Sequence, residues 1–255
     1  MSGILSAVKL CRFELTSEPG RPRSGIYHEG KVYETDGKNA IGIHGVQGIL
    51  FLSPVSRPPS LRFAGDDGDY EYGNPSVLSG PSELITLPED VLLVEVAPCL
   101  GVVVASAGRM VSIDEADSFV LGWVPAAVLV DGRPDSFRGS KADLGIALGA
   151  VITTPEELED RMTGKGLEQR LHLRAVIKQN GEVIASGVML PEDLCLPSVL
   201  EACSQTYGIA TGDLILLPSM SISDEAGNPL RLVGRAGDSF QIQVDQLGGV
   251  TVTLE

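Results

Sequence analysis

The residues best suited to nucleophilic or acid-base chemistry are three histidines and four cysteines. They are His28, His44 and His172, and Cys11, Cys99, Cys195 and Cys203. A cysteine beside a histidine could act as a nucleophile, and Cys99 with His44 or His28 is the pair that we consider. Single histidines at turn or strand positions are more often inert, however, and cysteines in apolar runs without a C-x-x-C pair are typically small buried residues.

Other familiar reactive motifs are missing from the sequence. It contains no H-E-x-x-H, G-x-S-x-G or P-loop pattern. The acidic stretch Gly65-Asp66-Asp67-Gly68, followed by Asp69 and Glu71, suggests calcium, but its spacing does not match an EF-hand loop. We interpret this stretch as a solvated loop.

Composition excludes several classes of partner. The formal net charge is -15, from 19 basic and 34 acidic residues, and no basic stripe compensates for it. Such a chain repels phosphate backbones, so we expect no nucleic-acid partner. No stretch is long and apolar enough to span a bilayer, and residues 1–12 contain no cleavage-like site, so we expect no membrane partner and a cytoplasmic protein.

The chemistry must be positioned by strands and turns rather than long helices, because glycine is frequent and helix-length periodicity is rare. Tight hairpins are indicated at Glu29-Gly30 and Asn180-Gly181. Two apolar runs, 91–104 and 122–130, indicate buried strands, and we expect the first to bend or bulge at Pro98. Alternating residues predict further strands at 8–15, 171–177, 240–244 and 250–254, and a glycine-rich strand pair at 42–52.

Helices are expected to be few. Ser112 and Glu115 form a capping box before a short helix over 116–119. Thr154-Pro155 begins a second helix that should end near Gly164. A third is predicted over 197–207, closed by Gly208.

Proline density between residues 53 and 60 indicates a linker. We therefore predict a small N-terminal β domain over residues 1–55 and a main domain over residues 56–255. Residues 61–74 are expected to be polar and loop-like. The fold class is mixed α+β and predominantly β.

The order of several segments resembles the fumarylacetoacetate hydrolase superfamily over residues 74–255, and more weakly over the N-terminal unit. The stretches that carry the resemblance are Tyr72-Gly73-Asn74-Pro75, Gly80-Pro81, Leu87-Pro88, residues 102–123, Asp143, Leu148-Gly149, Thr154-Pro155, Glu157-Leu158, Asn180-Gly181-Glu182, Gly212-Asp213, Gly237-Asp238 and Leu247-Gly248. No single piece is specific, but their order and spacing agree with the family. The resemblance implies a β-sandwich roll, a homodimer, and hydrolase, isomerase or decarboxylase chemistry on β-diketo or enol acids.

The resemblance also implies a Mg²⁺ site, formed by an E-x-E pair and a later aspartate. When the family's ligand positions are aligned with this sequence without gaps, they correspond to Ala97, Cys99 and Val128. Sliding the register by two residues places Glu95 at the first position, but Ala97 then takes the second. We therefore predict no metal and no cofactor in this chain, although the family uses Mg²⁺.

Other family positions have also changed. The stretch 61–72 contains no histidine where the family has its acid-base histidine, and it is too short for the usual lid. The family lysine falls on Ser140, and a one-residue bulge would restore Lys141. The family T-G-T becomes Leu217-Pro218-Ser219.

Three functions remain open. The first is a catalytically silent family member, a pseudoenzyme that acts as a binding or structural subunit, as a homodimer or with an intact paralogue. The second is a metal-free enzyme acting on a keto or enol acid. Its candidate residues are Lys141, Glu95, Arg138 and Asp143. The third is a small-molecule sensor that keeps the pocket without the chemistry.

Overall fold

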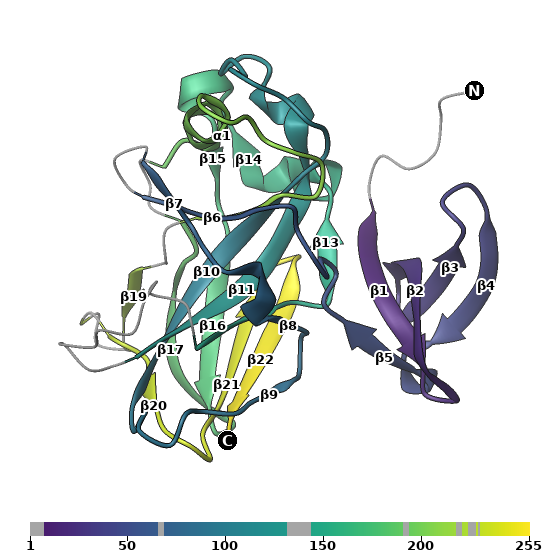
Figure 1. The fold of residues 1–255 in the computed structure, drawn as a ribbon, viewed down its shortest axis with the longest axis vertical. Coiled ribbons are helices and arrows are strands. Elements are labelled where there is room, and N and C mark those ends of the chain that lie inside the picture. Colours follow the sequence, from purple (N-terminus) through teal and green to yellow (C-terminus); the bar gives the residue numbers. More distant parts are fainter. Residues whose placement is uncertain are drawn as a thin grey trace.

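A computed structural model describes residues 8–65, 69–131, 144–190, 194–217, 221–223, 228 and 230–255. Within these residues the protein is predominantly β, as the sequence predicts (Figure 1). Fourteen strands form one large sheet, and six form a second. No helix in the described ranges is long and apolar enough to cross a membrane.

The N-terminal part of the large sheet lies to one side of the molecule (Figure 1). Its strands are β1 (Lys9–Leu15), β2 (Glu18–His28), β3 (Lys31–Thr35), β4 (Ala40–Gly45) and β5 (Ile49–Leu52). The expected pairing of β4 with β5 is wrong: β4 pairs with β3, and β5 pairs with β1. Strand β1 joins the main body through β13, with Leu10 opposite Ile152. Whether residues 1–55 form an independent domain stays a prediction.

The rest of the large sheet is built around two long strands. These are β10 (Val94–Val104) and β11 (Val120–Asp131), an antiparallel pair. Around them lie β6 (Leu61–Ala64), β7 (Tyr70–Tyr72), β8 (Leu78–Ser79), β12 (Gly145–Leu148), β13 (Val151–Thr153), β18 (Leu214–Leu216) and β20 (Val233–Gly234).

The smaller sheet packs against this pair. It contains β19 (Ser221–Ser223), β17 (Glu182–Val188), β16 (Arg174–Gln179), β21 (Ser239–Val244), β22 (Gly248–Leu254) and β9 (Leu84–Ile85), in that order. Strands β14 (Met162–Thr163) and β15 (Arg170–Leu171) form a separate pair.

Helical segments are short, as expected. The described ranges contain α1 (Leu196–Ser204) and the 3₁₀ turns η1 (Val46–Gly48), η2 (Pro75–Val77), η3 (Ala116–Phe119), η4 (Pro155–Arg161) and η5 (Gly166–Glu168). The helix expected after Thr154 is therefore a 3₁₀ segment. The hydroxyl of Thr154 accepts a hydrogen bond from Val8 N at 3.1 Å instead of capping that segment. Helix α1 ends earlier than expected, and Gly208 takes a positive φ of 78° beyond it.

Both predicted hairpin turns are confirmed. Glu29 and Gly30 have φ values of 47° and 76°, and Asn180 and Gly181 have 51° and 89°. Two-residue turns of this kind require positive φ at both positions, which glycine and asparagine adopt at low cost.

Strand β10 is regular at Pro98, so the expected bulge there is wrong. The shift in register lies between Val103 and Val104. Val96 N donates to Leu232 O, and Leu100 O accepts from Leu217 N, so the even-numbered backbone groups point away from β11. Pro98 is also an even-numbered residue, so an N–H at this position would point away from β11. Its absence therefore removes no hydrogen bond from the β10–β11 ladder.

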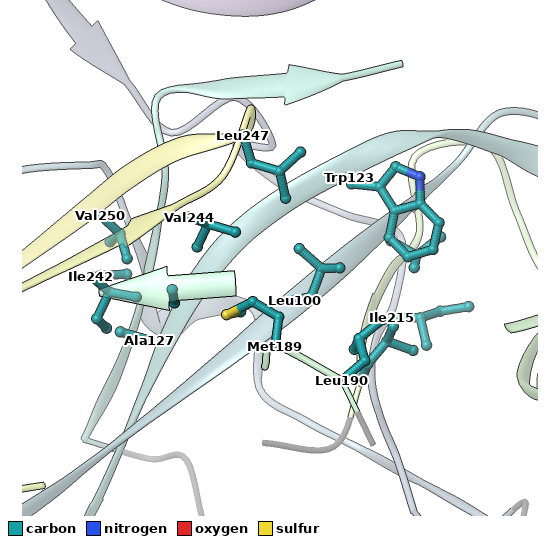
Figure 2. Packing of buried hydrophobic residues seen from close by; sticks show 14 of the residues in the cluster. Leu100, Trp123, Ala127, Met189, Leu190, Ile215, Ile242, Val244, Leu247 and Val250 are labelled. Atoms are coloured by element: carbon teal, nitrogen blue, oxygen red, sulfur yellow. The ribbon is translucent and has the colours of Figure 1, made fainter. Parts of the chain in front are cut away.

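The two faces of the β10–β11 pair belong to two apolar clusters. Leu100, Trp123 and Ala127 belong to the cluster that also contains Ile242 and Val250 of the smaller sheet (Figure 2). Cys99, Val124 and Val128 point to the opposite face and a second cluster. Because successive strand residues alternate between faces, burial on both sides explains why the two sequence runs are almost entirely apolar.

The expectation of a loop over residues 61–74 is also wrong. Strand β6 pairs in parallel with β18, so that Leu61 lies opposite Leu214, and antiparallel with β7. The pairing partner is more than 150 residues away in sequence. Such a contact is invisible to local patterns of polarity and turn residues.

Candidate functional site

The positions to which the family resemblance assigns metal ligands come together on one face of the β10–β11 pair. Ala97 lies directly opposite Val128, and Cys99 lies opposite Ala126. Ala97 and Cys99 are two residues apart on one strand, so they project to the same side. All three candidate positions, Ala97, Cys99 and Val128, line one cavity of about 570 Å³.

This cavity has an apolar floor and an acidic mouth. Its lining residues are Phe63, Ala64, Gly65, Asp69, Tyr70, Glu71, Glu95, Ala97, Cys99, Val128, Val130, Leu216 and Leu217. Cys99, Leu216 and Leu217 are at most 3% exposed. Asp69 and Glu71 are exposed and Glu95 is partly exposed. The volume lies in the range of small-molecule sites.

The β6–β7 hairpin forms one wall, and a buried arginine fixes it in place. Arg62 is 3% exposed. Its guanidinium donates to Gly208 O at 2.7 Å, to the carbonyl of Cys203, and to Asp213 Oδ2 at 3.3 Å. The rings of Tyr70 and Tyr72 each lie with their centroids 5.3 Å from the guanidinium carbon. The hydrogen bonds of Arg62 therefore attach the wall to the end of α1 and to Asp213 beside β18, and the two ring contacts join β6 to β7 within the hairpin.

Asp213 completes this anchor. It is 1% exposed, and its carboxylate accepts from Ser60 N and Ala210 N, each at 2.8 Å. A buried carboxylate with two backbone donors and an arginine partner has its hydrogen-bonding capacity well satisfied. The Gly212-Asp213 pair of the sequence thus has a structural role.

Glu95 is the one carboxylate of β10 that lines the cavity, and it has a cationic partner. Both of its oxygens accept hydrogen bonds from Arg231, with Nε at 3.1 Å from Oε1. The pKa of Arg231 is raised by the hydrogen bond and by the charge of Glu95. The other three candidates of the metal-free enzyme hypothesis, Lys141, Arg138 and Asp143, lie outside the described residues.

The side chains at the expected metal positions do not fit a divalent cation. Mg²⁺ and Mn²⁺ sites need oxygen ligands, and Ala97 and Val128 have no donor atom in their side chains. Burial raises the pKa of the Cys99 thiol to about 12, and sulfur is a soft ligand that is poorly suited to Mg²⁺. Among the described residues, no group of three or more His, Cys, Asp and Glu side chains could hold a metal ion.

The structure does not bring Cys99 together with a histidine. His44 Nε2 lies 2.8 Å from Glu34 Oε2, in the N-terminal strands. His28 is exposed beside Glu29, and His172 Nε2 lies 2.9 Å from the Thr163 hydroxyl. None of the three is among the residues that line the cavity around Cys99.

The contribution of the β6–β7 hairpin was missed at the sequence level. It supplies Phe63, Tyr70, Asp69 and Glu71 to the cavity. A sequence signal for this strand pair was present: apolar Leu61 and Phe63 alternate with charged Arg62, and Tyr70 and Tyr72 follow two residues apart. The acidic stretch that we interpret from the sequence as a solvated loop includes residues 66–68, which lie outside the described residues.

Comparison with known proteins identifies a family that matches most of this chain. The domain described as "Fumarylacetoacetate (FAA) hydrolase C-terminal" matches residues 65–255, most of the chain. The chain belongs to the fumarylacetoacetate hydrolase family. The family assignment made from ordered segments is therefore confirmed, and the match begins a few residues earlier than the resemblance indicated.

Solved structures with the same fold match nearly the whole chain. A 2-hydroxyhepta-2,4-diene-1,7-dioate isomerase from Mycobacterium marinum has a TM-score of 0.76 at 17% identity, and the match covers 97% of this chain and 98% of that one. A maleylpyruvate hydrolase from Sphingobium sp. SYK-6, in complex with manganese(II) and pyruvate, has a TM-score of 0.73 at 16% identity, with 96% and 98% covered. At these identities the likeness shows the fold alone, which confirms the expected fold class.

A curated relative is more similar in sequence. The 2,4-didehydro-3-deoxy-L-rhamnonate hydrolase of Sphingomonas sp. (strain SKA58) is 25% identical in an alignment 183 residues long that covers 68% of this chain. The matched stretch spans only 60% of that protein's length. The family and these relatives comprise hydrolases and isomerases.

Proposed function

We propose that this chain is a metal-free member of the fumarylacetoacetate hydrolase family that keeps a ligand cavity but lacks metal-dependent catalysis. One observation carries the proposal. Ala97, Cys99 and Val128 line the same cavity, at the positions that the family resemblance assigns to charged ligands. A pseudoenzyme of this kind acts as a binding or structural subunit.

The electrostatics of the cavity support this reading. A bound cation would polarise the oxygens of a keto acid and neutralise its negative charge. The described part of the lining has no Lys, Arg or His side chain to replace that cation. Its charged members are Asp69, Glu71 and Glu95.

The primary test is calorimetric titration of the purified full chain with Mg²⁺ and with Mn²⁺. We expect no stoichiometric binding below millimolar concentration. The Sphingobium maleylpyruvate hydrolase serves as the positive control, because its structure contains manganese. A tight, one-to-one site in the present chain would overturn the proposal.

A metal-free enzyme is the second candidate. It is favoured by the three carboxylates and by Tyr70, which line the same cavity and could exchange protons with a substrate. It predicts turnover of maleylpyruvate or a related keto acid in the presence of EDTA, with loss of that turnover in Glu71→Gln. The pseudoenzyme proposal predicts no turnover with or without Mn²⁺.

The partners and the compartment of the protein are also proposals. We propose a homodimer, or a complex with an intact paralogue, and we propose the cytoplasm because the four cysteines are all unpaired thiols. Light scattering coupled to gel filtration would measure the mass of the particle. A monomer that also fails to associate with an active relative from the same source would contradict the subunit role.

A further inference from the structure

The cavity at the former metal positions differs in polarity from a site built for keto acids. Its deepest residues are apolar: Val128 is 7% exposed, and Leu216 and Leu217 are at most 3% exposed. Phe63 adds aromatic surface from the β6–β7 hairpin, whereas the ring of Tyr70 lies against the guanidinium of Arg62. Apolar and aromatic linings of this kind bind the hydrophobic body of a ligand.

The mouth of the cavity carries negative charge. Asp69 and Glu71 are exposed there, on either side of Tyr70. Glu95 also lines the cavity, but its charge is balanced by Arg231. In the described lining, therefore, no cation is left to attract an anionic ligand, and two carboxylates remain to attract a cationic one.

The wall that carries these two carboxylates is anchored to the rest of the fold through its backbone and through Arg62. The backbone of Gly65 donates to Asp69 O at 2.8 Å, which closes the hairpin across its turn. Arg62, on β6, is buried and bonded to three groups outside the hairpin, and it also contacts the ring of Tyr70. Because the hairpin is fixed against β18, the charges stay above the apolar floor instead of moving away from it.

We infer that this cavity binds a small apolar molecule with a cationic end, such as an aryl-alkyl amine, and rejects carboxylates of the same shape. This inference rests on the proposed loss of the metal, because a bound divalent cation would reverse the polarity of the site. The apolar body would lie against Val128, Leu216 and Leu217. The ammonium group would lie at the mouth, near Asp69 and Glu71.

The test uses three probes of the same size, namely benzylamine, benzyl alcohol and benzoate. Their binding to the full chain is measured by ligand-observed NMR in EDTA at low salt. We expect the order amine, alcohol, carboxylate, with about tenfold between the first and the last. The preference should shrink in high salt, because the mouth is exposed and its charges are screened. Equal affinities, a reversed order or no binding would overturn the inference.

Two sets of variants separate the charge from the shape of the cavity. Glu71→Gln combined with Asp69→Asn should bring the affinities for amine and carboxylate together while leaving the alcohol unchanged. Val130→Phe, at the cavity wall, should weaken all three probes. The matched control is Val188→Phe, which changes an exposed valine on β17, a strand that does not line the cavity.

Failure of this inference is distinguishable from failure of the proposed function. Benzoate binding that persists in EDTA would overturn only the ligand class. Benzoate binding that appears only when Mg²⁺ or Mn²⁺ is added would overturn the metal-free function itself. Amine binding in EDTA that does not change when Mn²⁺ is added would support both.

Discussion

Ala97 and Val128 face each other across the β10–β11 ladder, and both side chains line the same cavity. The ladder is in continuous register from Val94 to Val103, so this pairing is part of a regular structure and not a local distortion. Two methyl-bearing side chains therefore occupy the place where the family resemblance assigns charged ligands. This relationship leads to the first of four predictions.

Restoring carboxylates should create a metal site. In the triple variant Ala97→Glu, Cys99→Glu and Val128→Asp, three acids would converge on one face, which is a ligand set suited to Mg²⁺ or Mn²⁺. Without metal, we expect the free energy of unfolding to fall by about 2–5 kcal/mol, because buried acids lack partners. Added Mn²⁺ should recover part of this loss, measured by urea unfolding.

Val128→Asp alone provides the control for that experiment. It introduces a single acid and should lose stability without gaining a response to Mn²⁺. If the triple variant also shows no response although it remains folded, the alignment of these positions with the family's ligands is wrong.

The Arg62 anchor should be important for stability. Arg62→Leu leaves the buried carboxylate of Asp213 without its cation and leaves two backbone carbonyls without donors. Removal of one partner from a buried ion pair typically costs about 3–5 kcal/mol. The matched control is Arg231→Leu, in which the side chain is 70% exposed and its loss should have little effect on the free energy of unfolding. Equal losses in urea unfolding would show that Arg62 is not an anchor.

Acid should weaken the N-terminal strands through Glu34. Burial acts to raise the pKa of this carboxyl, but hydrogen bonds from His44 and Arg23 outweigh it, and the net pKa is lowered from 4.5. A carboxyl with a depressed folded-state pKa contributes stability above its unfolded pKa and loses it as the pH falls through the folded value. The contribution is therefore present at pH 7 and is lost progressively as the pH falls below 4.5 and through the lowered folded-state pKa.

Glu34→Gln isolates this contribution from other groups. Asp36 and Asp238 also have lowered pKa values, so the whole chain loses stability in the same range. We expect the variant to be less stable than the parent protein at pH 7, and the difference to shrink towards pH 3.5. A constant difference across this range, measured by urea unfolding, would contradict the assignment.

The thiols should differ sharply in reactivity. Burial raises the pKa of Cys11 and Cys99 to about 12 and that of Cys203 to about 11, whereas Cys195 is only partly buried. Only thiolates react quickly with alkylating agents. With iodoacetamide at pH 8, mass spectrometry should therefore find rapid labelling at Cys195 alone, and at all four sites in urea. Rapid labelling of Cys99 in the folded protein would contradict the burial that raises its pKa.

The sequence by itself determined the family and the class of fold, and it led to the prediction that the metal ligands have been replaced. These conclusions depend on residue types in order, such as the apolar runs at β10 and β11 and the turns at Glu29-Gly30 and Asn180-Gly181. Hairpins and long antiparallel pairs join segments that are near in sequence, so their signals are local. For the same reason, Ala97 and Cys99 could be placed on one side of a strand before the structure was known.

Only the tertiary structure decided what surrounds those positions. The parallel pairing of β6 with β18 joins segments about 150 residues apart, and it brings Asp69, Tyr70 and Glu71 over the floor around Val128. Neither the order of residues nor their periodicity encodes such a pairing locally, because it depends on how the whole sheet assembles. The regular path of β10 through Pro98 was likewise decided by its neighbours, which left the missing N–H on the side facing away from β11.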